Sequence, residues 1–169
     1  MAGGQLRIML DANVWLDFFI PGRASSATAS RLIRSAVERN AELLYPSHII
    51  EDLFYEIRRD AAEWTRAGAG EVSREAARYC HDYAWGCMED LHELATAVAT
   101  DDADVLTALK FRSLSEDLGD NLVLVAAQRA GVDYLVTSDN VMLNKATVAA
   151  LAPQDMLSVL EEAPLRSPC

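Results

Sequence analysis

Short apolar segments alternate along the chain with longer segments in which apolar residues recur at helical spacing. The short segments, which are typical of buried β-strands, span residues 6–10, 42–45, 96–99, 134–137 and 148–151. Between them, apolar positions at i, i+3, i+4 and i+7 predict amphipathic helices, for example one that begins at Ser25 or Ser26. This alternation predicts an α/β fold: a three-layer α/β/α sandwich with a mainly parallel sheet of four or five strands.

The middle of the chain predicts two long helices, separated by a break at Gly68 and Gly70. The first follows the candidate N-cap Ser47, and its positions predicted to be buried are Ile50, Leu53, Phe54 and Ile57. The second runs from about residue 71 to residue 94, and its predicted packing residues are Tyr79, Tyr83 and Trp85. We therefore expect a single domain over residues 1–169, with a helical clip at about residues 60–94.

The composition is that of one globular domain with its own core. The chain has 169 residues, 51% of them apolar, and no apolar run approaches the ~20 residues that span a bilayer. The N-terminus has no apolar region of the kind found in signal peptides. We expect a soluble, cytoplasmic protein that does not enter the membrane. The three cysteines are too few and too widely spaced to predict a disulfide framework or a zinc site.

Charge is distributed unevenly. The chain has 15 basic and 26 acidic residues, a net charge of −11, and residues 79–169 contain five bases against 15 acids. A protein that coats a nucleic-acid duplex needs a basic face, so this balance argues against that function. The acidic half is compatible with divalent cations or with an arginine-bearing partner.

Carboxylates stand where strands end or helices begin. Asp11 follows the first predicted strand, Asp52 follows the second, and Asp139 lies two residues past the fourth. Asp117 and Asp120 are three residues apart in a predicted first helical turn and so share one face. Parallel strands end at one edge of a sheet, so these acids are expected to converge there. Packed carboxylates repel one another, and Mg²⁺ or Mn²⁺ held by oxygen ligands relieves that repulsion.

Four blocks resemble, in order and spacing, the acidic motifs of PIN-domain ribonucleases. They are LDANVWLD at residues 10–17, SHIIEDLFYEIRR at 47–59, DLGDNL at 117–122 and VTSD at 136–139. The resemblance covers about residues 6–157 and is greatest to the VapC-type toxins of bacterial toxin–antitoxin systems. One position departs from the pattern, because Gly119 stands where many relatives have Glu.

The resemblance implies a divalent-metal-dependent endoribonuclease that cleaves single-stranded RNA with metal-activated water. The implied catalytic metal ligands are Asp11, Asp52, Asp120 and Asp139, with Asp117 as a further ligand to Mg²⁺ or Mn²⁺. Alignment on Leu53 favours Asp52 over Glu51 in the second block. Residues implied to orient ligands or water are Asn13, Thr137 and Ser138.

The resemblance also implies partners. These are single-stranded or structured RNA, an antitoxin protein and a second copy of the chain. An arginine of the antitoxin would compete with the metal for the same carboxylates.

Three other interpretations fit parts of the pattern. A PIN-like scaffold that binds RNA or protein without catalysis would usually lose an acid, whereas each block here retains one. An aspartyl phosphotransferase of the haloacid dehalogenase type would need Asp at the position of Asn13. A receiver-like signalling domain would need a lysine near the last strand, where Lys145 is poorly placed.

Overall fold

A five-stranded, fully parallel sheet forms the centre of the molecule. The computed structural model describes residues 5–70 and 73–162. The strands are β1 (Arg7–Leu10), β2 (Glu42–Pro46), β3 (Thr96–Val98), β4 (Tyr134–Val136) and β5 (Ala150–Leu151). Their order is β3-β2-β1-β4-β5, so the first strand lies in the middle, with Met9 opposite Leu44 on one side and Leu135 on the other. The predicted α/β architecture and strand number are confirmed.

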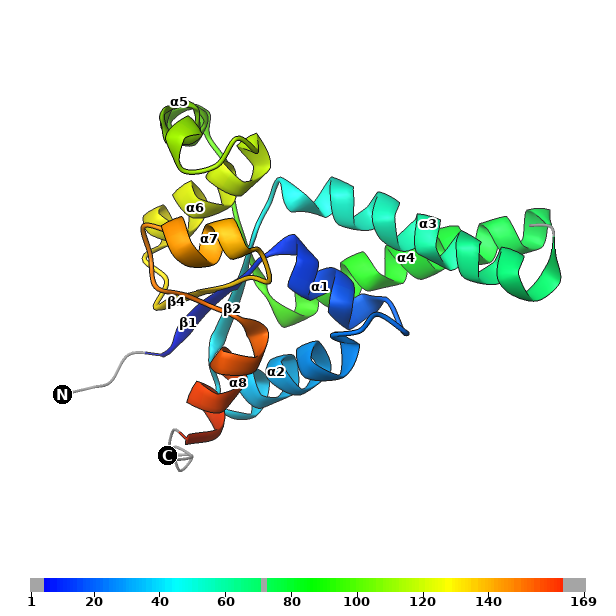
Figure 1. The fold of residues 1–169 in the computed structure, drawn as a ribbon. Helices are drawn as coiled ribbons and strands as arrows, with labels where there is room; N and C mark the ends of the chain where they lie inside the picture. The colour runs from blue at the N-terminus through cyan, green and yellow to red at the C-terminus, as the bar shows by residue number, and fades with distance from the viewer. Residues whose placement is uncertain (1–4, 71–72, 163–169) are drawn as a thin grey trace.

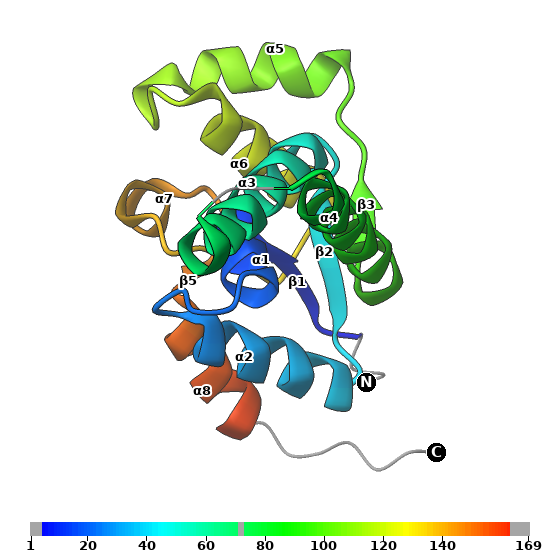
Figure 2. The same cartoon turned by 90° about the vertical axis from the view of Figure 1, so that its right-hand side faces the viewer.

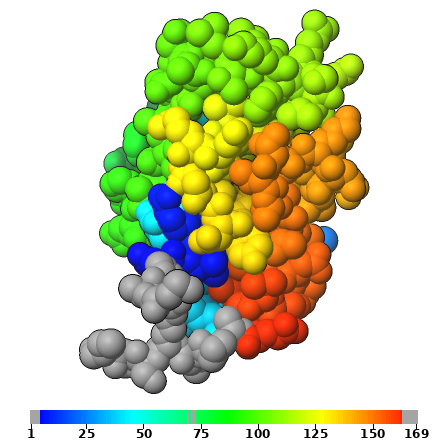
Figure 3. Space-filling view, turned by 90° about the vertical axis from the view of Figure 1, so that its left-hand side faces the viewer, coloured from blue at the N-terminus to red at the C-terminus, as the bar shows by residue number. Residues whose placement is uncertain are grey.

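Helices cover both faces of the sheet (Figure 1). They are α1 (Ala12–Phe19), α2 (Ser26–Glu38), α3 (Ile49–Ala69), α4 (Arg74–Leu94), α5 (Asp102–Lys110), α6 (Leu118–Ala130), α7 (Asn140–Lys145) and α8 (Pro153–Glu162). Helices α1–α4 lie on one face of the sheet, and α8 packs against α2 on that face. Helices α6 and α7 lie on the other face. Figure 3 shows this second side, where α6 (yellow) and α7 (orange) cover the sheet. The three layers enclose a core in which Met9, Trp15 and Leu135 are fully buried.

Helices α3 and α4 form an antiparallel hairpin that projects from the body (Figures 1 and 2). Its two helices touch where Thr65 Oγ1 lies 3.6 Å from Cys80 Sγ. The hairpin is tied to the body by the Tyr83 hydroxyl, which donates to the backbone oxygen of Phe19 at 2.6 Å. The hairpin begins at Ile49, well before the clip expected from about residue 60.

Several local predictions about this hairpin are wrong. Ser47 does not cap α3, because the residue before the helix is His48, and no side chain caps it. Ile49 is buried in place of Ile50, because the buried face of α3 runs through Ile49, Leu53 and Ile57. Tyr79 and Trp85 are exposed, because both lie outside the face of α4 that carries its buried residues, such as Ala84 and Leu91. Tyr83 is partly buried, as predicted.

Among the described residues, no helix is both long enough and apolar enough to cross a membrane. Cys80 and Cys87 are buried free thiols on α4, and Cys169 lies outside the described residues.

Candidate active site

The site is built on the adjacent strands β1 and β4, which bring Asp11 and Thr137 together. Asp11 ends β1, and its backbone N–H donates to the Val136 oxygen of β4 at 3.0 Å. Its side chain is the N-cap of α1: Oδ1 accepts the Ala12 N–H at 2.7 Å. Oδ2 accepts the Thr137 hydroxyl at 2.9 Å. The Asp11 carboxylate, only 5% exposed, is therefore held at the carboxyl edge of the sheet.

Thr137 connects two of the acids. Its fully buried hydroxyl donates to Asp11 and accepts the backbone N–H of Asp139 at 3.0 Å. Asp139 in turn is the N-cap of α7, where its Oδ1 accepts the Met142 N–H at 2.9 Å. A single threonine thus fixes the positions of the acids that follow β1 and β4.

A serine connects the two acids of the third block. Asp117 is the N-cap of α6, and its Oδ1 accepts the N–H groups of Gly119 at 2.7 Å and of Asp120 at 3.3 Å. The buried Ser115 hydroxyl donates to Asp120 Oδ2 at 2.9 Å and accepts the Asp117 N–H at 3.1 Å. A Cβ at position 119 would lie 3.0 Å from Asp117 Oδ1, so a side chain here would require a small shift of the capping carboxylate.

The carboxylates act on one another electrostatically. Burial raises the pKa of Asp11, and the charges of Asp120 and Asp139 raise it further, while the Thr137 and Ala12 hydrogen bonds lower it. Burial also raises the pKa of Asp120, with added repulsion from Asp117 and Asp139 and an opposing hydrogen bond from Ser115. Asp11, Asp120 and Asp139, which we call the carboxylate cluster, therefore share one electrostatic environment.

Comparison with known proteins identifies the family. A model of the PIN domain matches residues 7–141, which is most of the chain. The chain belongs to the PIN domain family.

The fold of this PIN domain is similar to that of a chain in a solved complex. That complex is described as VapBC2 from Rickettsia felis bound to a DNA fragment from their promoter. The match has a TM-score of 0.61 and 10% sequence identity, and it covers 87% of this chain and 98% of that chain. No curated protein matches the sequence.

The carboxylate cluster of this PIN domain has donor atoms of the kind that bind a divalent cation. Its members are oxygen donors that repel one another, and oxygen is the donor that Mg²⁺ and Mn²⁺ prefer. Within residues 5–70 and 73–162, however, no three His, Cys, Asp or Glu side chains form a ready-made metal site. Two of the carboxylates instead cap helices through Ala12 and Met142. A cation would thus draw together side chains that already share one edge of the sheet.

Asp52 lies apart from the carboxylate cluster in the described contacts. It is exposed in the first turn of α3, one turn after His48. Burial lowers the pKa of His48, and the Gly119 backbone and the Asp52 charge oppose that shift. His48 therefore lies between the first turn of α3 and the first turn of α6, and Asp52 stands at the margin of the site.

Two of the predicted orienting residues line a hollow beside the cluster. Asn13 and Ser138 are exposed, and with Asp17, Arg23 and Ser25 they line a pocket of about 330 Å³. Arg23 forms an ion pair with the buried Asp17, with Nε 2.6 Å from Oδ1. Of the three predicted orienting residues, Thr137 is the one that donates a hydrogen bond to a cluster carboxylate within the described part of the chain.

The sequence-based reasoning missed Ser115. The sequence does contain a signal for this role, because a serine two residues before a helix-capping Asp often accepts the backbone N–H of that Asp in a turn. The reasoning also missed Asn121, whose buried side-chain Nδ2 donates to the Ser115 carbonyl at 2.9 Å. These two residues hold the turn that presents Asp120.

Proposed function

We propose that this PIN domain is a divalent-metal-dependent endoribonuclease that hydrolyses phosphodiester bonds of single-stranded RNA. The observation that supports this most is the electrostatic coupling of Asp11, Asp120 and Asp139 at the carboxyl edge of β1 and β4. In the described part of the chain, no Lys or Arg forms an ion pair with any of the three. Uncompensated carboxylates at one edge are what a metal-assisted hydrolase requires.

The chain's own residues hold and orient the reacting groups. Asp11, Asp120 and Asp139 would hold Mg²⁺ or Mn²⁺, with Asp52 and Asp117 at the margin. When bound, such an ion lowers the pKa of water and stabilises charge on the phosphate. The Thr137 hydroxyl favours the ionised form of Asp11, which is the form that binds a cation. The Ser115 hydroxyl does the same for Asp120.

Cleavage of RNA tests this function, with a matched pair of variants. We expect the wild type to cut a labelled single-stranded RNA when Mn²⁺ or Mg²⁺ is added and to stop when EDTA is added. Asp11→Asn should abolish cleavage, whereas Asp155→Asn, a change to an exposed acid in the first turn of α8, should leave it intact. RNA binding without any metal-dependent cleavage would favour the non-catalytic scaffold instead.

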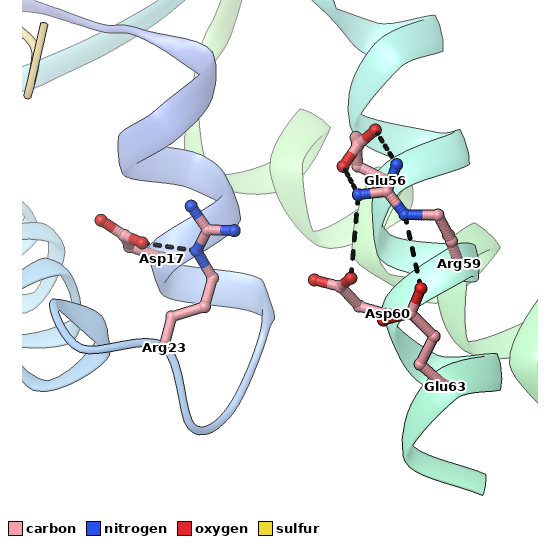
Figure 4. Close-up of polar contacts among 6 residues, drawn as sticks. All are labelled: Asp17, Arg23, Glu56, Arg59, Asp60 and Glu63. Carbon is pink, nitrogen blue, oxygen red and sulfur yellow. Dashed lines mark hydrogen bonds and ion pairs between the residues drawn. The ribbon is translucent and has the colours of Figure 1, made fainter. Parts of the chain in front are cut away.

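We further propose that an antitoxin occupies the groove between the α1–α2 loop and the α3–α4 hairpin. The groove is a pocket of about 490 Å³ whose apolar lining includes Ile20, Ile57 and Trp64. Its rim carries Asp60 and Glu63 on α3, across the groove from the Asp17–Arg23 pair (Figure 4). Both acids lie near Arg59 of the same helix, at 4.0 and 3.9 Å, and ion pairs this long contribute little. An apolar segment that bears an arginine fits this combination of lining and charge.

A second copy of the chain is proposed to pack on α5. This helix exposes Val105, Leu106 and Leu109 on the face away from α6. Size-exclusion chromatography of Leu106→Asp beside the wild type tests it. A homodimer that becomes monomeric supports the proposal, and an unchanged elution volume contradicts it.

A further inference from the structure

Four aromatic side chains cluster on the α3–α4 hairpin, and all of them except the half-buried Phe54 are exposed. Phe54 and Tyr55 come from α3, and His81 and Trp85 come from α4. The Phe54 ring lies 5.3 Å from the Trp85 ring, 5.7 Å from the His81 ring and 5.5 Å from the Tyr55 ring, measured between centroids. Tyr55 is 55% exposed and Trp85 is 54% exposed. We call these four residues the aromatic surface.

The rings support one another and remain partly exposed. Their planes meet at 63° to 88°, so each contact is edge to face. The Trp85 indole N–H donates to His81 Nε2 at 3.0 Å, which fixes the indole from its edge. A large aromatic side chain that is held at its edge and is 54% exposed, as Trp85 is, is suited to stacking with another ring.

The aromatic surface begins one helical turn from the candidate active site. Asp52 and Tyr55 are three residues apart on α3 and are therefore neighbours on the helix. The Asp52 charge and the backbone of Gly119, which precedes Asp120, both act on the pKa of His48, so the first turn of α3 lies near the first turn of α6. A continuous path of neighbouring residues thus leads from the carboxylate cluster, over the first turn of α3, to Trp85.

Arginines border the aromatic surface on the side toward the tip of the hairpin. Arg58 lies one turn beyond Tyr55 on α3, and within the described residues no ion pair is recorded for it. Arg78 lies one turn before His81 on α4; its side chain is 85% exposed and only 3.9 Å from that of Asp82. An ion pair this exposed contributes little, so both guanidinium groups are accessible to an anion.

We propose that the aromatic surface is a base-stacking site for the single-stranded RNA that flanks the scissile phosphate. Nucleobases stack on its rings, and Arg58 and Arg78 contact the phosphates. Exposed aromatic rings beside cations are the combination that binds single strands without reading their sequence. This inference rests on the proposed ribonuclease function. A peptide partner has a separate place, since none of the four rings lines the groove on the hairpin.

Equilibrium binding of RNA tests the inference without catalysis. Fluorescence anisotropy of a labelled oligoadenylate is measured in EDTA for the wild type, Trp85→Ala, Trp85→Phe and Trp64→Ala. Trp64 is the matched control, because it is 74% exposed on the same hairpin but lies outside the aromatic surface. Removal of one stacking ring should raise the Kd about five-fold or more. Trp64→Ala and Trp85→Phe should stay close to the wild type.

Two further binding measurements distinguish base stacking from other causes of weaker RNA binding. A strand with abasic residues should bind the wild type and Trp85→Ala equally, because it has nothing to stack. Tyr55→Ala should weaken oligoadenylate binding as well, so the result does not depend on the folding of one variant. A Kd that is unchanged in both variants would overturn the inference, as would equal weakening for the abasic strand.

The remaining outcomes distinguish the surface from other assignments. If Trp85→Ala turns a dimer into a monomer and leaves RNA binding unchanged, the surface is an interface between copies and the inference is wrong. If the wild type binds oligoadenylate through Trp85 but cuts no RNA with Mn²⁺, the stacking site is supported and the proposed ribonuclease function fails.

Discussion

Replacing Thr137 with valine tests how the site holds its acids. Valine has nearly the shape of threonine, so the change removes the hydroxyl and keeps the volume. The hydroxyl is fully buried, donates to Asp11 Oδ2 at 2.9 Å and accepts the Asp139 N–H at 3.0 Å. A hydrogen bond to a charged group contributes about 1.5–3 kcal/mol, and a backbone N–H left without an acceptor costs about 1 kcal/mol more. We expect Thr137→Val to lower the free energy of unfolding by about 2–4 kcal/mol at neutral pH.

The effect depends on pH in a defined direction. The Thr137 hydrogen bond lowers the pKa of Asp11 and so stabilises its ionised form. Without that bond, the folded-state pKa of Asp11 rises further above 3.8, its ordinary value. The loss of stability is therefore largest at neutral pH and shrinks as the pH falls toward 3.8, where Asp11 is protonated in the folded state.

The assay is urea denaturation of the metal-free protein, with Thr137→Ser as the control. Serine keeps the hydroxyl and loses one buried methyl, at a cost of about 1 kcal/mol. The expected order of stability is wild type, then serine, then valine. If valine is as stable as the wild type, or more stable than serine at neutral pH, the hydroxyl does not hold the acids as described.

Four further substitutions have defined outcomes. Because burial and neighbouring charges raise the pKa of Asp11, ionisation of Asp11 destabilises the metal-free fold as the pH rises above 3.8. Calorimetry should therefore show that metal-free Asp11→Asn melts at a higher temperature than the wild type, by a difference that grows toward neutral pH and is absent below pH 3.8. A difference in melting temperature that is the same at every pH would contradict this. Asp120→Asn should abolish RNA cleavage, whereas Asp117→Asn should reduce it mildly, since asparagine keeps the helix cap; equal losses in a cleavage assay would contradict the difference. Tyr83→Phe removes the hydrogen bond to the Phe19 oxygen and should lower the free energy of unfolding by about 1 kcal/mol without changing the cleavage rate; a slower rate would couple the hairpin to catalysis.

The central architecture could be predicted from the sequence, because the pattern and the chemistry agree there. Short apolar runs that alternate with helical segments predict parallel strands, and the structure confirms that Asp11 follows β1 beside β4. The short helices α1 and α7 were not predicted. Each begins directly at an acid that caps it, so the same residue carried both a structural and a functional signal.

Other features depend on tertiary structure that periodicity does not describe. Helical spacing places Trp85 on one face of its helix, but only the fold shows that the hairpin projects and leaves this face open. Likewise, the role of Ser115 arises from the turn that brings its hydroxyl to both Asp117 and Asp120. Asp52 matches its motif in sequence, yet the described contacts place it beside His48 and not in the carboxylate cluster.

The most direct test of the account is a crystal structure of the wild type grown with Mn²⁺, with the anomalous signal of the metal measured. The account predicts one or two manganese peaks at the carboxyl edge of β1 and β4, within bonding distance of Asp11, Asp120 and Asp139. The carboxylates should turn toward the ion while the Thr137 and Ser115 hydrogen bonds persist. An anomalous peak elsewhere, or a fully occupied site that lacks Asp11 and Asp120, would contradict the proposed metal-dependent chemistry.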